Sequence, residues 1–324
     1  MVSSEKIFNI NSKKEFESLA IEIFKYQAKK NLVYNKYITS LGIDFMNIDE
    51  LEKIPFLPIN FFKSQQIISS KNNIDKVFFS SGTSGLRSKH YVFDLNLYEK
   101  SLIKSFEYFY GNIKNYTFYA LIPSIQSLNE SSLVYMTKKF IQLSENANSN
   151  FYFNDYNHLF KKLSSIQNKK TILIGLGFAL LDFCKKFPLK LNNTIVIETG
   201  GMKNINKEMH KVELHQILKK KFNTNQIHSE YGMTELLSQS YSKKNGKFKS
   251  PPWKKVQCRD ITDPLSSNKN SGAINIIDLA NYHSCSFIAT NDLGKINNDN
   301  TFEILGRLQE SDIRGCNQIL DQIT

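Results

Sequence analysis

The sequence has 324 residues, of which 41% are hydrophobic and 22% charged, so a wholly disordered chain is excluded and one large or two ordinary domains are expected. The net charge of +12 does not indicate a nucleic-acid partner, because the lysines are scattered and only four arginines occur. No run of 18 apolar residues and no signal peptide is found, so we expect a cytoplasmic protein without a membrane span. The four cysteines form no CxxC pair and are expected to be free thiols.

The N-terminal part of the sequence predicts an amphipathic helical region followed by an irregular apolar segment. Over residues 11–46, apolar side chains such as Phe16, Leu19 and Ile23 recur three and four positions apart, which is the period of a helix with one buried face. Residues 54–63 contain two prolines, which forbid a regular helix. We expect this apolar segment to pack against the body of the protein or to line a pocket.

From residue 76 to about residue 240, short apolar segments alternate with helical ones. Strands are predicted at residues 77–79, 117–122, 171–174 and 194–197, and helices at residues 94–109, 129–143, 177–187 and 204–221. This alternation is typical of an α/β fold whose sheet is rich in parallel strands.

Beyond about residue 240 the helical pattern ends. Strands separated by Gly, Asn and Asp turns are predicted at residues 255–258, 273–277, 286–289 and 302–305. We therefore expect an α/β core with an N-terminal helical segment over residues 1–245 and a β-rich subdomain over residues 246–324.

Two short segments carry residue types that bind phosphate and metal. The segment Ser80-Ser81-Gly82-Thr83-Ser84-Gly85 follows a predicted strand; its glycines let the backbone approach an anion, and its hydroxyl and amide groups can donate to phosphate oxygens. It lacks the end of a Walker A loop, and alone it is equally compatible with a surface turn. The segment Tyr231-Gly232-Met233-Thr234-Glu235 offers a hydroxyl for phosphate and a carboxylate for Mg²⁺, a cation that prefers oxygen ligands.

A third pair of polar residues lies in the β-rich part. Asp292 is on a predicted turn, where a carboxylate can accept both hydroxyls of a ribose, and Arg307 can reinforce that contact or meet a phosphate. Taken singly, each of these charges is more simply explained as a solvated turn residue, and Thr234 as a helix cap.

In this order the segments resemble those of the adenylate-forming superfamily. The resemblance implies that residues 80–85 bind the phosphates of ATP, that Thr234 contacts phosphate and that Glu235 holds Mg²⁺. It also implies that Asp292 and Arg307 hold the ribose. The expected fold is therefore the large domain of that superfamily, with parallel-rich sheets flanked by helices and a β-rich C-terminal subdomain.

The resemblance also suggests a place for the adenine and reveals a departure in the phosphate loop. Gly200 and Gly201 end a predicted strand where the superfamily has its adenine-contacting backbone, and Tyr231 is assigned to the same contact. The superfamily's loop usually continues with Pro-Lys, whereas here Lys89 is present without the proline. Lys89 is nevertheless expected to contact the phosphates.

More narrowly, the sequence resembles the LuxE-type acyl-protein synthetases, from about residue 54 to the end. The resemblance rests on residues 56–63, 230–239, 251–253 and 259–260. Enzymes of this type supply a long-chain acyl group to a reductase in bacterial luciferase systems. The resemblance therefore implies ATP and Mg²⁺ as cofactors, a carboxylic acid such as a fatty acid as substrate, and an acyl-accepting protein such as a reductase as partner.

The end of the sequence differs from most members of the superfamily and carries a cysteine. The sequence stops soon after Arg307, so the mobile C-terminal domain with its catalytic lysine is expected to be absent. In LuxE-type proteins a cysteine near the C-terminus receives the acyl group as a thioester, and Cys316 has that position. A thiolate can attack an acyl-adenylate because AMP leaves readily, and the nearby Arg314 would lower the pKa of the thiol. From residue type alone, a buried and inert cysteine is the commoner role.

Two other functions stay open. A carboxylate–coenzyme A ligase of the phenylacetate type would use the same adenylate with a diffusible thiol, but the expected absence of the C-terminal domain argues against it. A non-catalytic subunit that binds an acyl group or a nucleotide could keep the same motifs. The intact set of Thr234, Glu235, Asp292 and Arg307 argues against that loss of activity.

Overall fold

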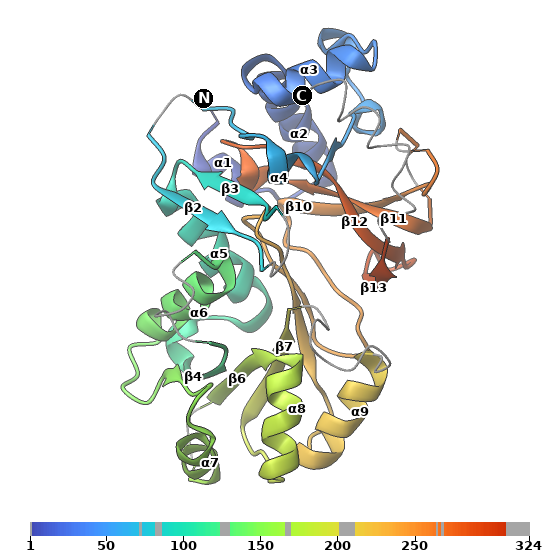
Figure 1. Cartoon of the computed structure of the whole chain (residues 1–324). Coiled ribbons are helices and arrows are strands. Elements are labelled where there is room, and N and C mark those ends of the chain that lie inside the picture. Colours follow the sequence, from blue (N-terminus) through green and yellow to red (C-terminus); the bar gives the residue numbers. More distant parts are fainter. Residues whose placement is uncertain are drawn as a thin grey trace. The chain divides into compact units, whose positions relative to one another are not determined.

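Most of the chain is described by a computed structural model, which contains two compact units (Figure 1). Unit 1 consists of Met1–Leu102, Met233–Ser238 and Lys249–Thr324, and unit 2 of Ile103–Gly232 and Gln239–Phe248. The residues that the structure describes are 2–70, 73–81, 86–123, 130–165, 170–200, 211–263, 265–266 and 269–308.

The two units do not follow the predicted division after residue 245. Strand β1, Leu57–Pro58, pairs in parallel with strand β12, Phe287–Ile296, so the N-terminal hundred residues and the β-rich segment belong to one unit. Sequence periodicity does not reveal this pairing, because β1 has only two residues.

Unit 1 is built on a five-stranded sheet with the order β1-β12-β11-β10, in which β13 also pairs with β12. Its other strands are β10 (Lys254–Arg259), β11 (Ser271–Asp278) and β13 (Phe302–Arg307). All neighbours except β1 and β12 are antiparallel. The β-rich segment predicted beyond residue 240 is thus confirmed.

The N-terminal helical region is divided rather than continuous. It contains α1 (Ser4–Phe8), α2 (Lys13–Lys30) and α3 (Leu32–Ser40), followed by the 3-10 turns η1 (Phe45–Asn47) and η2 (Leu51–Lys53). Asn31 ends α2 and begins α3, since its Oδ1 accepts a hydrogen bond from the Tyr34 amide at 3.0 Å. Asparagine favours such capping bonds over helix continuation, so the helical region predicted over residues 11–46 is observed as two helices that meet at Asn31.

The rest of unit 1 includes a hairpin that the periodicity did not predict. Strand β2, Lys76–Phe79, pairs antiparallel with β3, Lys89–Val92, and Phe79 is opposite Lys89. The remaining elements are α4 (Phe61–Ser64) and η5 (Leu279–Asn281). Helix α5 (Leu95–Tyr110) belongs to unit 1 only as far as Leu102. The hairpin brings residue 80 next to residue 88.

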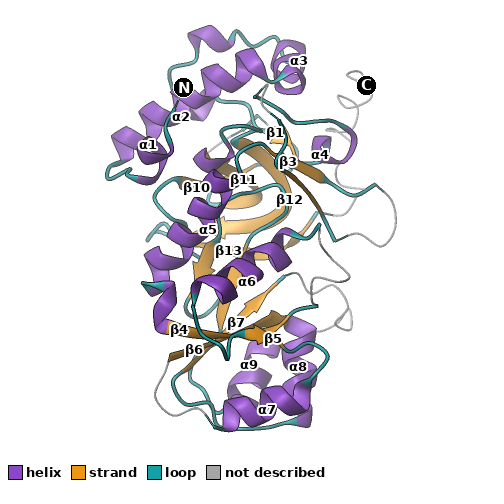
Figure 2. Ribbon diagram, turned by 90° about the vertical axis from the view of Figure 1, so that its left-hand side faces the viewer, coloured by secondary structure: helices purple, strands orange, loops and turns teal. Residues whose placement is uncertain are grey.

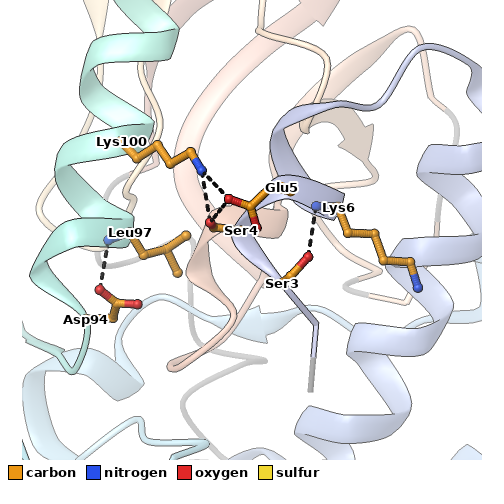
Figure 3. Close-up of polar contacts among 7 residues, drawn as sticks. All are labelled: Ser3, Ser4, Glu5, Lys6, Asp94, Leu97 and Lys100. Carbon is orange, nitrogen blue, oxygen red and sulfur yellow. Dashed lines mark hydrogen bonds and ion pairs between the residues drawn. The ribbon is translucent and has the colours of Figure 1, made fainter.

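Short helix α1 is tied to α5 by polar contacts (Figure 3). The Lys100 ammonium of α5 donates to Ser4 Oγ and to Glu5 Oε1, each at 3.0 Å. Both helices begin with a side-chain cap: Ser3 Oγ accepts from the Lys6 amide, and Asp94 Oδ1 accepts from the Leu97 amide. The caps satisfy amides that have no partner within the helix.

Unit 2 is an α/β layer around a six-stranded sheet with the order β5-β4-β6-β7-β8-β9. Only β9 is antiparallel to its neighbour, which confirms the predicted parallel-rich sheet. Its strands are β4 (Tyr116–Leu121), β5 (Asn150–Phe151), β6 (Lys170–Leu176), β7 (Thr194–Thr199), β8 (His228–Tyr231) and β9 (Ser240–Ser242). Its other elements are η3 (Ile113–Asn115), α6 (Ser132–Leu143), α7 (Tyr156–Ser164), α8 (Gly177–Lys186) and α9 (Lys211–Phe222).

Helices α7, α8 and α9 gather beside one part of this sheet (Figure 2). Their apolar side chains, among them Leu159, Phe183 and Leu218, form one buried cluster with Leu173 of β6 and Val196 of β7. The continuous apolar sequence of β6 fits its central position, where both faces of a parallel sheet are covered.

Two buried histidines make the fold sensitive to acid. Burial lowers the pKa of His90, in unit 1, and of His228, in unit 2, to about 4 in each case. Between pH 6.5 and 4 the unfolded chain therefore binds protons that the folded chain excludes, so the free energy of unfolding should fall as the pH falls, by up to about 3 kcal/mol per histidine. Urea unfolding of the wild type and of His228→Asn at pH 7.0 and pH 4.5 measures this. An unchanged pH dependence in the variant would contradict it.

Candidate active site

Residues 233–238, which carry Thr234 and Glu235, are held in unit 1 by a buried asparagine. Asn281 Nδ2 donates to the Glu235 carbonyl at 2.8 Å, and Asn281 Oδ1 accepts from the Leu237 amide at 3.0 Å. The Asn281 side chain is fully buried on η5. A buried amide that uses both its ends in this way fixes the backbone on either side of Glu235, because an unmade bond would be costly there.

The same segment is anchored at its other end by a buried polar network around Ser238. Ser238 Oγ donates to Asp278 Oδ1 at 2.6 Å and accepts from Trp253 Nε1 at 2.9 Å. The ammonium of Lys254 donates to the Ser238 carbonyl at 2.8 Å. Asp278 is fully buried and Lys254 nearly so, and the two residues are cross-strand partners. The network therefore places two buried charged residues, Lys254 and Asp278, at the Ser238 end of the segment, where the positive charge of Lys254 partly offsets the burial of Asp278.

Glu235 itself is buried among polar groups of unit 1. Its side chain is 5% exposed. Burial raises the pKa of this carboxyl, while the nearby Ser88 side chain and the positive charge of Arg307 act in the opposite direction. The nearby negative charge of Asp292 raises the pKa further. A cation bound next to this carboxyl would therefore favour its ionised form.

Asp292 and Arg307, the predicted ribose pair, are brought together by strand pairing. They are opposite each other where β12 pairs with β13, and Arg307 Nε is 3.6 Å from Asp292 Oδ1. The Arg307 side chain is 57% exposed and that of Asp292 is 16% exposed. Since both act electrostatically on Glu235, the three charged residues predicted from the last two motifs share one neighbourhood.

The β2–β3 hairpin, which carries the predicted phosphate loop, is closed at its base by two serines. The Ser80 amide donates to the Ser88 carbonyl, and the Ser88 amide donates to Ser80 Oγ, each at 3.0 Å. Ser81 is exposed next to this closure, and Gly82, Thr83, Ser84 and Gly85 lie outside the described residues. The described part of the hairpin therefore fixes where the loop begins and ends.

The cations near this loop contact an aromatic ring rather than one another. The Lys89 ammonium is 5.9 Å from the centre of the Phe79 ring, and the guanidinium of Arg87 is 5.1 Å from the same centre. Arg87 Nε also donates to the Ser80 carbonyl at 2.7 Å. Arg87 thus contacts the strand that enters the loop, a contact that the sequence alone could not assign.

In unit 2, Gly200 directly follows strand β7, and Tyr231 is the last residue of the neighbouring parallel strand β8. Ile197 of β7 is opposite His228 of β8, and the same register continued places Gly200 opposite Tyr231. Gly200 has φ of +78°, and a Cβ there would lie 2.9 Å from Leu176 Cδ2, so glycine is required. Gly201, the remaining residue predicted at the adenine, lies outside the described residues.

A buried charged cluster next to these strand ends was not predicted. Glu198 Oε2 lies 2.9 Å from the Lys211 ammonium and 3.6 Å from His215 Nε2. Although burial alone would raise the pKa of Glu198, Lys211 and His215 lower it below its usual value. Thr199 Oγ1 donates to Glu230 Oε2 at 2.5 Å. Glu230 directly precedes Tyr231 and Glu198 lies two positions before Gly200, and this nearness to the predicted adenine residues was their only signal in the sequence.

The described cysteines do not have the environment of a nucleophile. Cys184, Cys258 and Cys285 are buried, and burial raises the pKa of their thiols to about 11, 11 and 12. A reactive cysteine needs a lowered pKa and exposure. Cys316, the predicted acyl acceptor, lies outside the described residues.

Comparison with known proteins shows which family the chain belongs to. A family model described as "Acyl-protein synthetase, LuxE" matches residues 4–324. The chain belongs to the LuxE acyl-protein synthetase family. A LuxE relative, the long-chain-fatty-acid–luciferin-component ligase of Photorhabdus luminescens, is 34% identical over 74 residues, which are 22% of this chain and 63% of that protein.

Solved structures show the fold of this LuxE family member. ATP-bound MatB from Rhodopseudomonas palustris is similar with a TM-score of 0.57 and 15% identity, over 74% of this chain and 49% of that one. O-succinylbenzoate coenzyme A synthetase (MenE) from Bacillus subtilis, in complex with AMP, has a TM-score of 0.50 and 13% identity, over 74% and 50%. The predicted adenylate-forming fold is thus confirmed, and the chain spans about half the length of these two structures.

Among the helices that the structure describes, none is both long and apolar enough to span a membrane. Within the described part of the chain, no group of three or more His, Cys, Asp or Glu side chains could hold a metal ion by itself.

Proposed function

We propose that this protein activates a carboxylic acid with ATP and then transfers the acyl group to a protein cysteine. In the first step a carboxylate oxygen attacks the α-phosphorus of ATP, the bond to pyrophosphate breaks, and acyl-AMP forms. In the second step a thiolate attacks the acyl carbonyl and AMP leaves with the electron pair of the broken bond. The observation that carries the proposal is the grouping of Glu235 with Asp292, Arg307 and Ser88, the last of which closes the β2–β3 hairpin, in a LuxE family chain.

Separate roles follow for the residues of the site. Thr234 and the loop at residues 80–85, with Lys89, contact the phosphates, and Asp292 and Arg307 hold the ribose. The strand ends that carry Gly200, Gly201 and Tyr231 hold the adenine. The placement of Gly200 and Tyr231 at the ends of two neighbouring parallel strands supports this.

The donor set fits Mg²⁺ bound together with ATP. Mg²⁺ is usually held by one or two carboxylates together with substrate phosphates and waters, rather than by a cage of protein ligands. Glu235 is a buried carboxylate whose ionisation is opposed by burial, so an arriving cation would be stabilising. Glu235 would hold the ion, which when bound would offset the negative charge of the phosphates.

We further propose a fatty acid as the substrate and Cys316 as the first acceptor. The name of the Photorhabdus luminescens relative, a long-chain-fatty-acid ligase, supports the acid. The buried state and raised pKa of Cys184, Cys258 and Cys285 support Cys316, because none of these three thiols is suited to attack. A partner protein with its own acceptor cysteine, such as a reductase, would then receive the acyl group.

The proposal is tested by incubating the protein with ATP, Mg²⁺ and a panel of radiolabelled acids from short-chain to long-chain. We expect pyrophosphate release that depends on the acid and is largest for a long-chain acid. Consumption of coenzyme A in parallel assays would instead indicate a coenzyme A ligase. Absence of pyrophosphate release with every acid would indicate a binding subunit and would contradict the proposal.

Replacing Cys316 with alanine should separate the two steps. Acyl-AMP should still form, because the adenylation residues are unchanged, while protein-bound label that hydroxylamine removes should be lost. Denaturing gel electrophoresis with autoradiography, before and after hydroxylamine, measures this label. Cys258→Ala serves as the control and should keep the label, since Cys258 is buried. Label that persists in Cys316→Ala would show that another residue is the acceptor.

A further inference from the structure

Strand β3 carries two buried polar residues that contact the Thr234–Glu235 segment within unit 1. Ser88 directly precedes the strand and His90 is its second residue, so the two side chains point to the same face. Ser88 is 3% exposed and His90 is 1% exposed. Neither was predicted to belong to the site, because a lone serine and a lone histidine carry no spacing signal.

His90 contacts the backbone of Thr234 through one defined tautomer. His90 Nδ1 is 2.8 Å from the Thr234 carbonyl, which can only accept, so Nδ1 carries the proton. His90 Nε2 is 2.9 Å from Ser284 Oγ, whose hydroxyl can donate to it. Burial lowers the pKa of His90 to about 4, so the imidazole is neutral at neutral pH and both contacts persist.

Ser88 connects the first serine of the phosphate loop with Glu235. Its backbone makes the two hydrogen bonds that close the hairpin on Ser80, and its side chain is near enough to the Glu235 carboxyl to lower the pKa of that group. One residue is therefore fixed to the start of the loop through its main chain while its hydroxyl acts on Glu235. Two residues of one strand face thus contact two consecutive residues of the later motif.

We propose that Ser88 and His90 are positioning residues that set the placement of Thr234 and Glu235 relative to the phosphate loop. The inference rests on the adenylation proposed above. Both residues act through others: His90 through the backbone of Thr234, and Ser88 through the carboxyl of Glu235. Since a displacement of about 1 Å in reacting groups can lower a rate by about 100-fold, their loss should reduce kcat more than it raises KM.

A pair of substitutions at His90 distinguishes positioning from mere filling of the core. The amide nitrogen of asparagine can replace Nδ1, so His90→Asn can keep the bond to Thr234. Glutamine reaches the place of Nε2, so His90→Gln can keep only the bond to Ser284. We expect kcat for acid-dependent pyrophosphate release to fall less than fivefold in His90→Asn and about 10- to 100-fold in His90→Gln, with KM for ATP within threefold of wild type in both. Equal kcat values in two variants of equal thermal midpoint would overturn the role of His90.

Ser88→Ala is the second and independent variant, which keeps the inference testable if a His90 variant folds poorly. It removes only the hydroxyl, and we expect kcat to fall about tenfold, as for a lost interaction with a charged group. Ser105→Ala is the matched control, because Ser105 is a fully buried serine whose Oγ has no hydrogen-bond partner among the described residues. It should keep the wild-type kcat.

The failure of this inference is distinguishable from failure of the proposed function. A wild-type protein that releases no pyrophosphate with any acid would overturn the proposed adenylation, and this inference with it. An active wild type together with a Ser88→Ala variant of unchanged kcat and Mg·ATP affinity would overturn the role of Ser88 alone. Calorimetric titration of Mg·ATP without acid supplies the affinity and needs no turnover.

Discussion

Replacing Glu235 with glutamine is expected to lower the rate of acid-dependent pyrophosphate release by about 100-fold. The substitution keeps the size of the side chain and removes the charge proposed to hold Mg²⁺. Because Glu235 is buried and burial opposes its ionisation, the neutral side chain should not destabilise the fold. Initial rates at saturating acid and ATP, together with a thermal unfolding curve, measure both effects.

Glu303→Gln is the control for this change, because it makes the same substitution in the same unit. Glu303 is on β13 and pairs with Lys295 at 3.2 Å, where its side chain is 23% exposed. Its loss should leave the rate unchanged. A Glu235→Gln variant that folds and keeps the wild-type rate would show that this carboxylate does not hold the metal.

The second large effect is on stability, and it concerns Lys254 and Asp278, the two buried charged residues at the Ser238 end of the Thr234–Glu235 segment. Replacing Lys254 with methionine should lower the free energy of unfolding by about 3–5 kcal/mol, because Asp278 then stays buried without its compensating cation. Asp278→Asn alone should also destabilise, since it leaves the buried Lys254 uncompensated. The double variant should lose less than the sum of the two single variants. Urea unfolding of all four proteins measures the coupling.

An exposed pair in the same sheet supplies the comparison. The Lys295 side chain is 44% exposed where it pairs with Glu303, so Lys295→Met should cost less than about 1 kcal/mol. Additive effects at Lys254 and Asp278 would show that the two charges do not interact, and that hydrogen bonds alone account for the anchor at Ser238.

The fold was predictable wherever a run of residues shows one clear period. Strands β4, β6 and β7 and helices α5 and α8 were expected within two residues of their observed limits, because buried strands and amphipathic helices have strong local patterns. The periodicity does not show where one capping side chain divides a helical region or where a strand depends on a distant partner. Asn31 divides the predicted N-terminal helical region into α2 and α3, and β3, which was not predicted, pairs with β2.

The charged residues of the candidate site could be predicted from the sequence, but the residues that hydrogen-bond to their segment could not. Glu235, Asp292 and Arg307 could be found because their motifs occur in a recognisable order, and strand pairing then brings the last two together. Asn281 contacts the Glu235 carbonyl from 46 positions away, and His90 contacts Thr234 from 144 positions away. Contacts of that separation depend on the tertiary fold, and no local pattern encodes them.

The way the chain passes between the units limits how this protein can be recombined with its relatives. Strands β8 and β9 form an antiparallel pair in unit 2, in which Tyr231 is opposite Ser240, yet residues 233–238 of their connection belong to unit 1. A chimera that exchanges unit 2 as the single block 103–248 would therefore import a foreign Thr234–Glu235 segment against the hydrogen-bonding side chains of Asn281 and Asp278. A functional chimera needs two further crossovers, one on each side of this six-residue segment. Natural variation should respect the same boundary, so residues 233–238 should co-vary with η5 and β10 rather than with the strands that flank them.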